Sequence, residues 1–192
     1  MLGSEKITLA RDSNKTLASS WARVCTLVVL LSAPTISSFA NQGAPPKACS
    51  APEYRQFDFW IGDWDAFDVD APSKVVARTH VNQVMDGCVL LEDYQGIDGH
   101  HGQSFTIYDA STKVWRQSWV TNRGESLIIE GEWHDGAIIL SGSDRVGGRD
   151  RLVRGTWKSE GKNVRETAVV STDGGKNWTQ WFDIIFRPHP QN

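Results

Sequence analysis

From residue 62 onward the chain alternates between short β-like runs and tight-turn signals, and this rhythm constrains the fold more than any other feature. Asp-Gly, Asn-x-Gly and Gly-Gly steps supply the positive-φ residues that tight hairpins require. Between the turns, residues alternate in strand fashion, as in 115–119, and no sustained helical period follows residue 60. We therefore predict ten strands, at 62–70, 74–84, 88–95, 103–109, 114–121, 126–133, 136–142, 149–158, 162–171 and 178–187.

Ten strands joined by short hairpins predict an all-β domain, a single closed up-and-down barrel of antiparallel strands. Closure removes the exposed strand edges that an open meander would leave. A two-sheet sandwich is the alternative architecture. The barrel domain is expected to span 53–188, after a polar, proline-rich lead-in at 41–52 that is typical of a flexible segment.

The first forty residues differ from the rest of the chain. A basic stretch that ends at Arg23 is followed by the apolar run 24–31, and Ser38-Phe39-Ala40 places small residues at positions −3 and −1 of a cleavage site. The apolar run is too short for a stable membrane anchor. We interpret 1–40 as a secretory signal peptide and Asn41 as the first mature residue. The expected location is periplasmic or secreted, with no membrane association after cleavage.

The cysteines offer one cross-link. Cys25 lies in the predicted signal, so the mature chain keeps Cys49 and Cys88. Two cysteines in an oxidising compartment allow one pairing. Two buried thiols or a metal pair are the alternatives, although two cysteines are too few for a structural zinc site. We predict a disulfide between Cys49 and Cys88.

Charge and motifs argue against several functional classes. The formal net charge is −3, whereas a nucleic-acid partner requires a basic surface. The sequence has no Gly-x-Ser-x-Gly elbow, no phosphate-binding glycine loop and no His-Glu-x-x-His spacing. We therefore expect no nucleic-acid partner, no metal and no cofactor. The adjacent His100 and His101, in a glycine-rich loop, are the remaining candidates for a metal or haem ligand, and a solvated pair is the alternative.

Three neighbouring strands carry rows of polar and aromatic residues that strand alternation places on one face each. If these faces point inward, they line a cavity suited to a small-molecule ligand. The alternative is that the tryptophans are ordinary core and that the polar residues face solvent. The candidate ligand-binding residues are Glu92, Tyr94, Ser104, Thr106, Tyr108, Trp115, Gln117 and Trp119.

Glu92 follows an apolar run and is the strongest candidate for chemistry. A carboxylate enclosed in a barrel has a raised pKa unless it is paired, so it could act as a general acid or base, or hold a polar group of a ligand. Tyr94 and Tyr108 are candidate partners in acid–base catalysis. The alternative is a structural carboxylate paired with an arginine such as Arg116 or Arg165.

Residues 57–65 read Phe-Asp-Phe-Trp-Ile-Gly-Asp-Trp-Asp, and Gly62-x-Trp64 at the start of the first strand resembles the Gly-x-Trp signature of lipocalins and their calycin relatives. The longer string, together with segments at 87–92, 104–109, 115–119 and 171–178, is similar to a family of secreted bacterial lipocalin-like domains of largely unknown function. The resemblance implies that Trp64 plugs one end of the barrel and that Arg187, from the last strand, lies across it. It implies no established catalytic residues.

Three hypotheses for function follow. The first is an exported lipocalin-like barrel that binds a small, mostly apolar molecule. The second is an enzyme on the same barrel, of isomerase, cyclase or lyase type, that uses Glu92 with a tyrosine; fold analogy alone supports it. The third is an interaction module without a cavity. An enclosed pocket with a buried, unpaired carboxylate would favour the second, and a dry apolar pocket the first.

Overall fold

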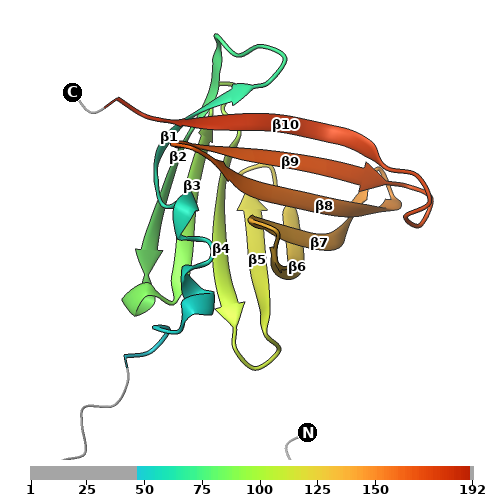
Figure 1. Cartoon of the computed structure of the whole chain (residues 1–192). Helices are drawn as coiled ribbons and strands as arrows, with labels where there is room; N and C mark the ends of the chain where they lie inside the picture. Colours follow the sequence, from blue (N-terminus) through green and yellow to red (C-terminus); the bar gives the residue numbers. More distant parts are fainter. Residues whose placement is uncertain (1–46, 191–192) are drawn as a thin grey trace, which may run out of the picture. The chain divides into compact units, whose positions relative to one another are not determined.

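Ten antiparallel strands and three short 3₁₀ helices make up the computed structural model, which describes residues 47–190 (Figure 1). Every predicted strand is present, with its ends shifted by a few residues at most. The strands are β1 (Gly62–Asp68), β2 (Val75–Val84), β3 (Val89–Gly96), β4 (His101–Asp109), β5 (Val114–Thr121), β6 (Ser126–His134), β7 (Ala137–Val146), β8 (Arg149–Glu160), β9 (Asn163–Ser171) and β10 (Thr179–Pro188).

Each strand pairs with the next along the chain, and β1 pairs with β10 to close the barrel. The closing register matches Ala66 with Phe186 and Asp65 with Arg187. Closure leaves none of the ten strands with an unpaired edge. The predicted up-and-down barrel is thus confirmed, and the sandwich alternative is wrong.

The predicted disulfide is present and connects Cys49 to Cys88, whose Cα atoms are 5.0 Å apart. Cys88 directly precedes β3, so the bond ties the segment ahead of the barrel to the barrel wall. The predicted signal peptide 1–40 and residues 41–46 of the lead-in lie outside the described residues. Within 47–190, no helix is long and apolar enough to cross a membrane.

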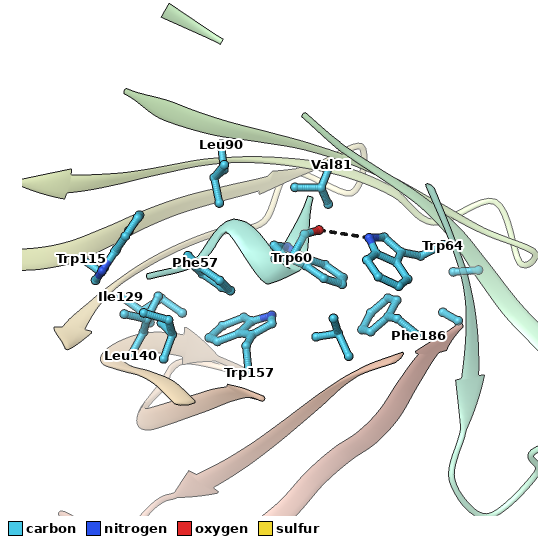
Figure 2. Packing of buried hydrophobic residues seen from close by; sticks show 14 residues of the cluster. Phe57, Trp60, Trp64, Val81, Leu90, Trp115, Ile129, Leu140, Trp157 and Phe186 are labelled. Carbon is cyan, nitrogen blue, oxygen red and sulfur yellow. Dashed lines mark hydrogen bonds between the residues drawn. The ribbon is translucent and has the colours of Figure 1, made fainter. Parts of the chain in front are cut away.

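The segment before β1 enters the barrel as a plug (residues 52–60). It contains two 3₁₀ helices that the sequence analysis did not predict, η1 (Pro52–Arg55) and η2 (Asp58–Trp60); η3 (Met85–Gly87) lies between β2 and β3. Figure 2 shows Phe57 and Trp60 surrounded by side chains from the barrel wall. The Phe57 ring meets Trp157 edge-on at 5.8 Å, and Trp60 meets Phe186 at 4.5 Å. The plug therefore fills one part of the barrel interior with aromatic rings.

Trp64 belongs to the same core. Its ring stacks on Trp60 with centroids 5.8 Å apart, and its indole N–H donates a hydrogen bond to the Trp60 carbonyl at 3.0 Å (Figure 2). A Cβ on Gly62 would lie 2.9 Å from the Trp64 ring. The glycine of Gly-x-Trp is therefore required because the tryptophan ring lies against its backbone.

The prediction that Arg187 lies across Trp64 is wrong. Arg187 pairs with Asp65, which is the neighbour of Trp64 and points to the opposite face of the sheet. The Arg187 guanidinium lies 4.2 Å from the ring centroid of Phe67 and donates to the Pro72 carbonyl at 2.9 Å. The arginine thus covers the outside of the barrel, and inside it Trp60 covers Trp64.

Candidate ligand-binding cavity

The barrel encloses a cavity of about 400 Å³. One part of its wall, formed by Trp157 and Phe186, also contacts the plug. Another part carries the solvent-exposed side chains of Arg123 and Glu125, which mark the mouth. The lining residues are Glu92, Tyr94, His100, Gln117, Trp119, Arg123, Glu125, Leu127, Ile129, Val153, Gly155, Trp157, Glu166, Ala168, Trp181, Phe182, Ile184 and Phe186.

Strand β4 turns its polar face inward. Ser104 and Thr106 are 1% and 2% exposed, whereas Phe105 and Ile107, the apolar residues next to them, are 47% and 37% exposed on the outside. The buried hydroxyls of Ser104 and Thr106 have hydrogen-bond partners. Gln117 Nε2 donates to Thr106 Oγ1 at 3.2 Å and to Ser104 Oγ at 3.4 Å. Polar side chains thus form one inner wall of the barrel.

Glu92 is the acidic end of this network. It is 8% exposed, and Ser104 Oγ donates to its Oε2 at 2.8 Å. Burial raises the pKa of the Glu92 carboxyl to about 7, and the hydrogen bond from Ser104 offsets only part of that effect. Near neutral pH the group therefore exchanges a proton readily.

The two arginines named as possible partners of Glu92 bind other acids. Arg116 lies on the outer wall, where its Nε is 3.3 Å from Asp109. Arg165 forms two hydrogen bonds with Asp183, at 2.8 and 2.6 Å. The paired-carboxylate alternative for Glu92 with either arginine is therefore wrong.

A second carboxylate, Glu166 on β9, also lines the cavity, and the sequence analysis missed it. Burial and the charge of Glu92 raise its pKa well above the ordinary value, although a hydrogen bond from the Trp157 side chain lowers it in part. One sequence signal could have located it: Val164 and Ala168 are apolar and have the same strand parity as Glu166, so Glu166 is expected on their face of the strand. The barrel thus places two carboxyls in one cavity, and the charge of Glu92 acts on the ionisation of Glu166.

An aromatic cluster lies beside the carboxyls. Tyr94 meets Trp119 and His100 edge-on, with ring centroids 5.9 Å apart in both pairs. Burial, and then the charge of Glu166, raise the pKa of Tyr94 to about 12, so its hydroxyl stays protonated as a hydrogen-bond donor. A Cβ on Gly102 would lie 2.2 Å from the Trp119 ring, so only glycine leaves room for that ring against β4.

The mouth is formed by the β3–β4 and β5–β6 loops. Arg123 bridges them through an ion pair with Asp98 at 2.7 Å, and Asn122 Nδ2 donates to the Gly99 carbonyl at 2.9 Å. His100 Nε2 lies 4.0 Å from Glu125, beyond hydrogen-bond distance, and among the described residues it has no hydrogen-bond partner although it is buried. His100 Nε2 is therefore a buried polar atom at the mouth without a hydrogen-bond partner among the described residues.

The two adjacent histidines diverge. His100 lines the cavity, whereas His101 lies outside and contacts Asp93 at 3.2 Å. Within the described part of the chain, no three His, Cys, Asp or Glu side chains form a group able to hold a metal ion.

The remaining predicted site residues divide between two places. Glu92, Tyr94, Gln117 and Trp119 line the cavity, and Ser104 and Thr106 are buried behind it. Trp115 and Tyr108 belong to the plug region instead: Trp115 donates from Nε1 to Gln56 Oε1 at 3.1 Å, and Tyr108 meets Tyr54 edge-on at 5.3 Å. The two tyrosines named as candidate acid–base groups therefore lie in different environments, and only Tyr94 shares the cavity with Glu92.

No protein-family model matches this chain, and no curated protein is similar to it at a significant level. The resemblance to lipocalin-like domains thus rests on the sequence motifs, and the chemistry of the cavity rests on its geometry.

Proposed function

We propose that this protein is an exported, lipocalin-like barrel that binds a small, mostly apolar molecule in its cavity. The observation that carries the proposal is the cavity itself. Its volume of about 400 Å³ is within the range of small-molecule sites, and its wall combines aromatic and aliphatic side chains with a few polar groups. The interaction module without a cavity is less well supported, because large side chains fill only the plug end of the barrel.

Export is supported by the disulfide between Cys49 and Cys88. Such bonds persist in oxidising compartments. Together with the signal-like sequence of residues 1–40, the bond favours a periplasmic or secreted location for the barrel.

The binding proposal is tested with a neutral fluorescent probe, N-phenyl-1-naphthylamine, and by native mass spectrometry of protein purified from its own host. We expect saturable binding of one probe per chain and a retained small molecule that competes with it. Ala168→Phe, which places a ring in the cavity, should abolish probe binding, whereas Thr167→Phe, one position along β9, should not. Absence of saturable binding to the folded protein would refute the proposal.

A second candidate function, which the buried Glu92 carboxyl without an arginine partner among residues 47–190 favours, is acid–base catalysis in the same cavity; binding is proposed first because both candidates require it. Catalysis is favoured by Glu92, whose pKa of about 7 suits proton transfer at neutral pH, and by Glu166, which lines the same cavity. The test is the fate of the retained molecule. A catalyst would convert it over time, and Glu92→Gln would stop conversion while the molecule still binds. A binding protein would release it unchanged.

A further inference from the structure

We propose that the ligand of the cavity is an organic cation, an amine on an aromatic or aliphatic body, whose ammonium group lies between Glu92 and Glu166. This inference rests on the proposed binding function and gives its ligand a chemical class.

The first argument is the charge balance of the cavity wall. Among the described residues, three carboxyl side chains line the cavity, and Arg123 is the only lysine or arginine in its wall. Arg123 lies at the exposed mouth and already pairs with Asp98 at 2.7 Å. Among the described lining residues, the inner carboxyls Glu92 and Glu166 therefore face an interior without a permanently charged cation.

The second argument is that ionised Glu92 and Glu166 side chains destabilise the folded protein unless a positive charge lies near them. A buried carboxylate without a countercharge is destabilising, and its usual remedy is protonation. Both Glu92 and Glu166 have pKa values raised by burial, and the charge of Glu92 raises the pKa of Glu166 further. A bound ammonium would stabilise the ionised forms of Glu92 and Glu166, because it supplies a positive charge and hydrogen-bond donors.

The third argument is the aromatic surface beside the acids. Tyr94, Trp119 and Trp157 line the same cavity, and aromatic faces attract ammonium groups by cation–π interaction. On β10, Phe182, Ile184 and Phe186 provide apolar surface for the rest of the ligand, and Ile184 is paired with Glu166 in the sheet. An organic cation uses both the acids and this apolar surface, whereas an inorganic cation would use only the acids.

A neutral ligand is the main rival, because protonated carboxyls can donate hydrogen bonds to a carbonyl. An anionic ligand is disfavoured by the same two acids. Three probes of similar size separate these classes: 2-phenylethylamine, 2-phenylethanol and phenylacetate. Isothermal titration calorimetry near neutral pH and at physiological salt should show that the amine binds at least about tenfold more tightly than the alcohol, a difference of about 1.4 kcal/mol, and that phenylacetate binds most weakly.

Proton release gives a readout on the unaltered protein. Because the ammonium favours ionised Glu92 and Glu166, its binding should release protons to the buffer, and the heat should differ between phosphate and Tris in proportion to their ionisation enthalpies. Amine affinity should also rise with pH through the range in which these acids titrate. The other titratable groups facing the cavity are Tyr94, His100, Arg123 and Glu125. 2-Phenylethanol should show neither effect.

Variants assign the effect to the two acids. Glu166→Gln and Glu92→Gln should each lower amine affinity at least about tenfold, because each removes a charge-assisted contact, and should lower 2-phenylethanol affinity far less. Glu132→Gln, on an exposed position of β6, is the matched control and should change neither.

The outcomes separate the two proposals. If the amine and the alcohol bind equally, or if both carboxyl variants keep the preference for the amine, the cation proposal is wrong and the binding function stands. If none of these probes binds and N-phenyl-1-naphthylamine does not bind either, both proposals fail. Should one variant not fold, the other variant and the proton-release measurement still decide.

Discussion

Trp64 donates its indole N–H to the backbone carbonyl of Trp60 at 3.0 Å, and the two rings stack with only 14° between their planes. The bond joins the first strand to the plug, so the same side chain that begins the barrel also fixes the segment that fills it. The ring of Phe186, on the last strand, packs edge-on against the ring of Trp60. The start and the end of the domain therefore meet in one aromatic cluster.

This contact predicts a graded response at Trp64. Trp64→Phe removes the donor and leaves the buried Trp60 carbonyl without it, at a cost of about 1–3 kcal/mol. Trp64→Ala also empties the ring site and should cost about 3–5 kcal/mol. Urea unfolding followed by circular dichroism measures both. Trp133→Ala, at a residue 38% exposed, is the control and should cost far less. Equal losses for all three variants would contradict this assignment.

Arg187 should be energetically independent of Trp64. Its guanidinium contacts Phe67 and the Pro72 carbonyl outside the barrel, so Arg187→Ala should cost about 1 kcal/mol or less. A double-mutant cycle should give no coupling with Trp64→Ala and a measurable coupling with Phe67→Ala. Coupling to Trp64 instead would contradict the structure and would favour the arrangement in which Arg187 lies across Trp64.

The buried carboxyls predict that stability falls as pH rises. The folded protein holds the Glu92 proton up to a pKa of about 7, whereas the unfolded chain loses it near the ordinary value of 4.5. The stabilisation is thus complete below the unfolded pKa and is lost as pH rises through the folded one. The pKa of Glu166 is also raised by burial, so its ionisation adds to the loss of stability. The midpoint of thermal unfolding should therefore decrease between about pH 5 and 8.

The double variant Glu92→Gln/Glu166→Gln should flatten that decrease, and Glu132→Gln should retain it. Four aspartates act in the opposite direction at lower pH, because hydrogen bonds lower the pKa values of Asp93 and Asp98 and lower those of Asp109 and Asp173 to about 2. Their contribution is present above the ordinary value of 3.8 and is lost as pH falls below it, outside the range of the test. A midpoint that rises with pH in the wild-type protein would refute the assignment of the two acids.

Reduction of the disulfide should destabilise the barrel by about 2–4 kcal/mol, because the cross-link closes a loop with a sequence separation of 39 and restricts the unfolded chain. The double variant Cys49→Ser/Cys88→Ser should show the same loss without reductant. Thiol titration of the denatured, unreduced protein checks the bond directly: no free thiol is expected in the mature chain. An unchanged free energy of unfolding after complete reduction would show that the disulfide does not stabilise the barrel.

We predict that the chain is exported and that processing leaves Asn41 as its first residue, since Ser38-Phe39-Ala40 has the form of a cleavage site. N-terminal sequencing of protein recovered from the periplasm or the medium makes the measurement. Ala40→Phe, which places a bulky side chain at the cleavage position, should block processing. Recovery of mature protein that still contains residues 24–36 would disprove the cleavage.

Alternation and turn chemistry were enough to locate all ten strands, because both depend on local sequence. The local sequence does not determine which face of a strand points into the barrel. On β4 the polar Ser104 and Thr106 turn inward because Glu92 and Gln117, on neighbouring strands, offer them hydrogen-bond partners. Apolar Phe105 is left outside, against the usual expectation. The orientation follows from pairing across strands, which a single segment does not reveal.

The wrong position of Arg187, the omission of Glu166 and the omission of the plug have different causes. Arg187 was placed by family resemblance, although strand parity with the buried Phe186 already directs it outward. Glu166 was missed because polar residues on both sides of it, Arg165 and Thr167, hide the alternation of β9. The plug was missed because its 3₁₀ turns are too short to produce a periodic pattern.

The pairing of β1 with β10 also has a consequence for the order in which the chain matures. Synthesis delivers the N-terminal end first, so Phe57, Trp60 and Trp64 emerge long before Phe186, the last of their partners. Until the final strand arrives, the nascent domain exposes its most aromatic segment and an open edge on β1. The barrel can close only after this last strand has been synthesised, so the aromatic segment stays without its final partner until the end of synthesis.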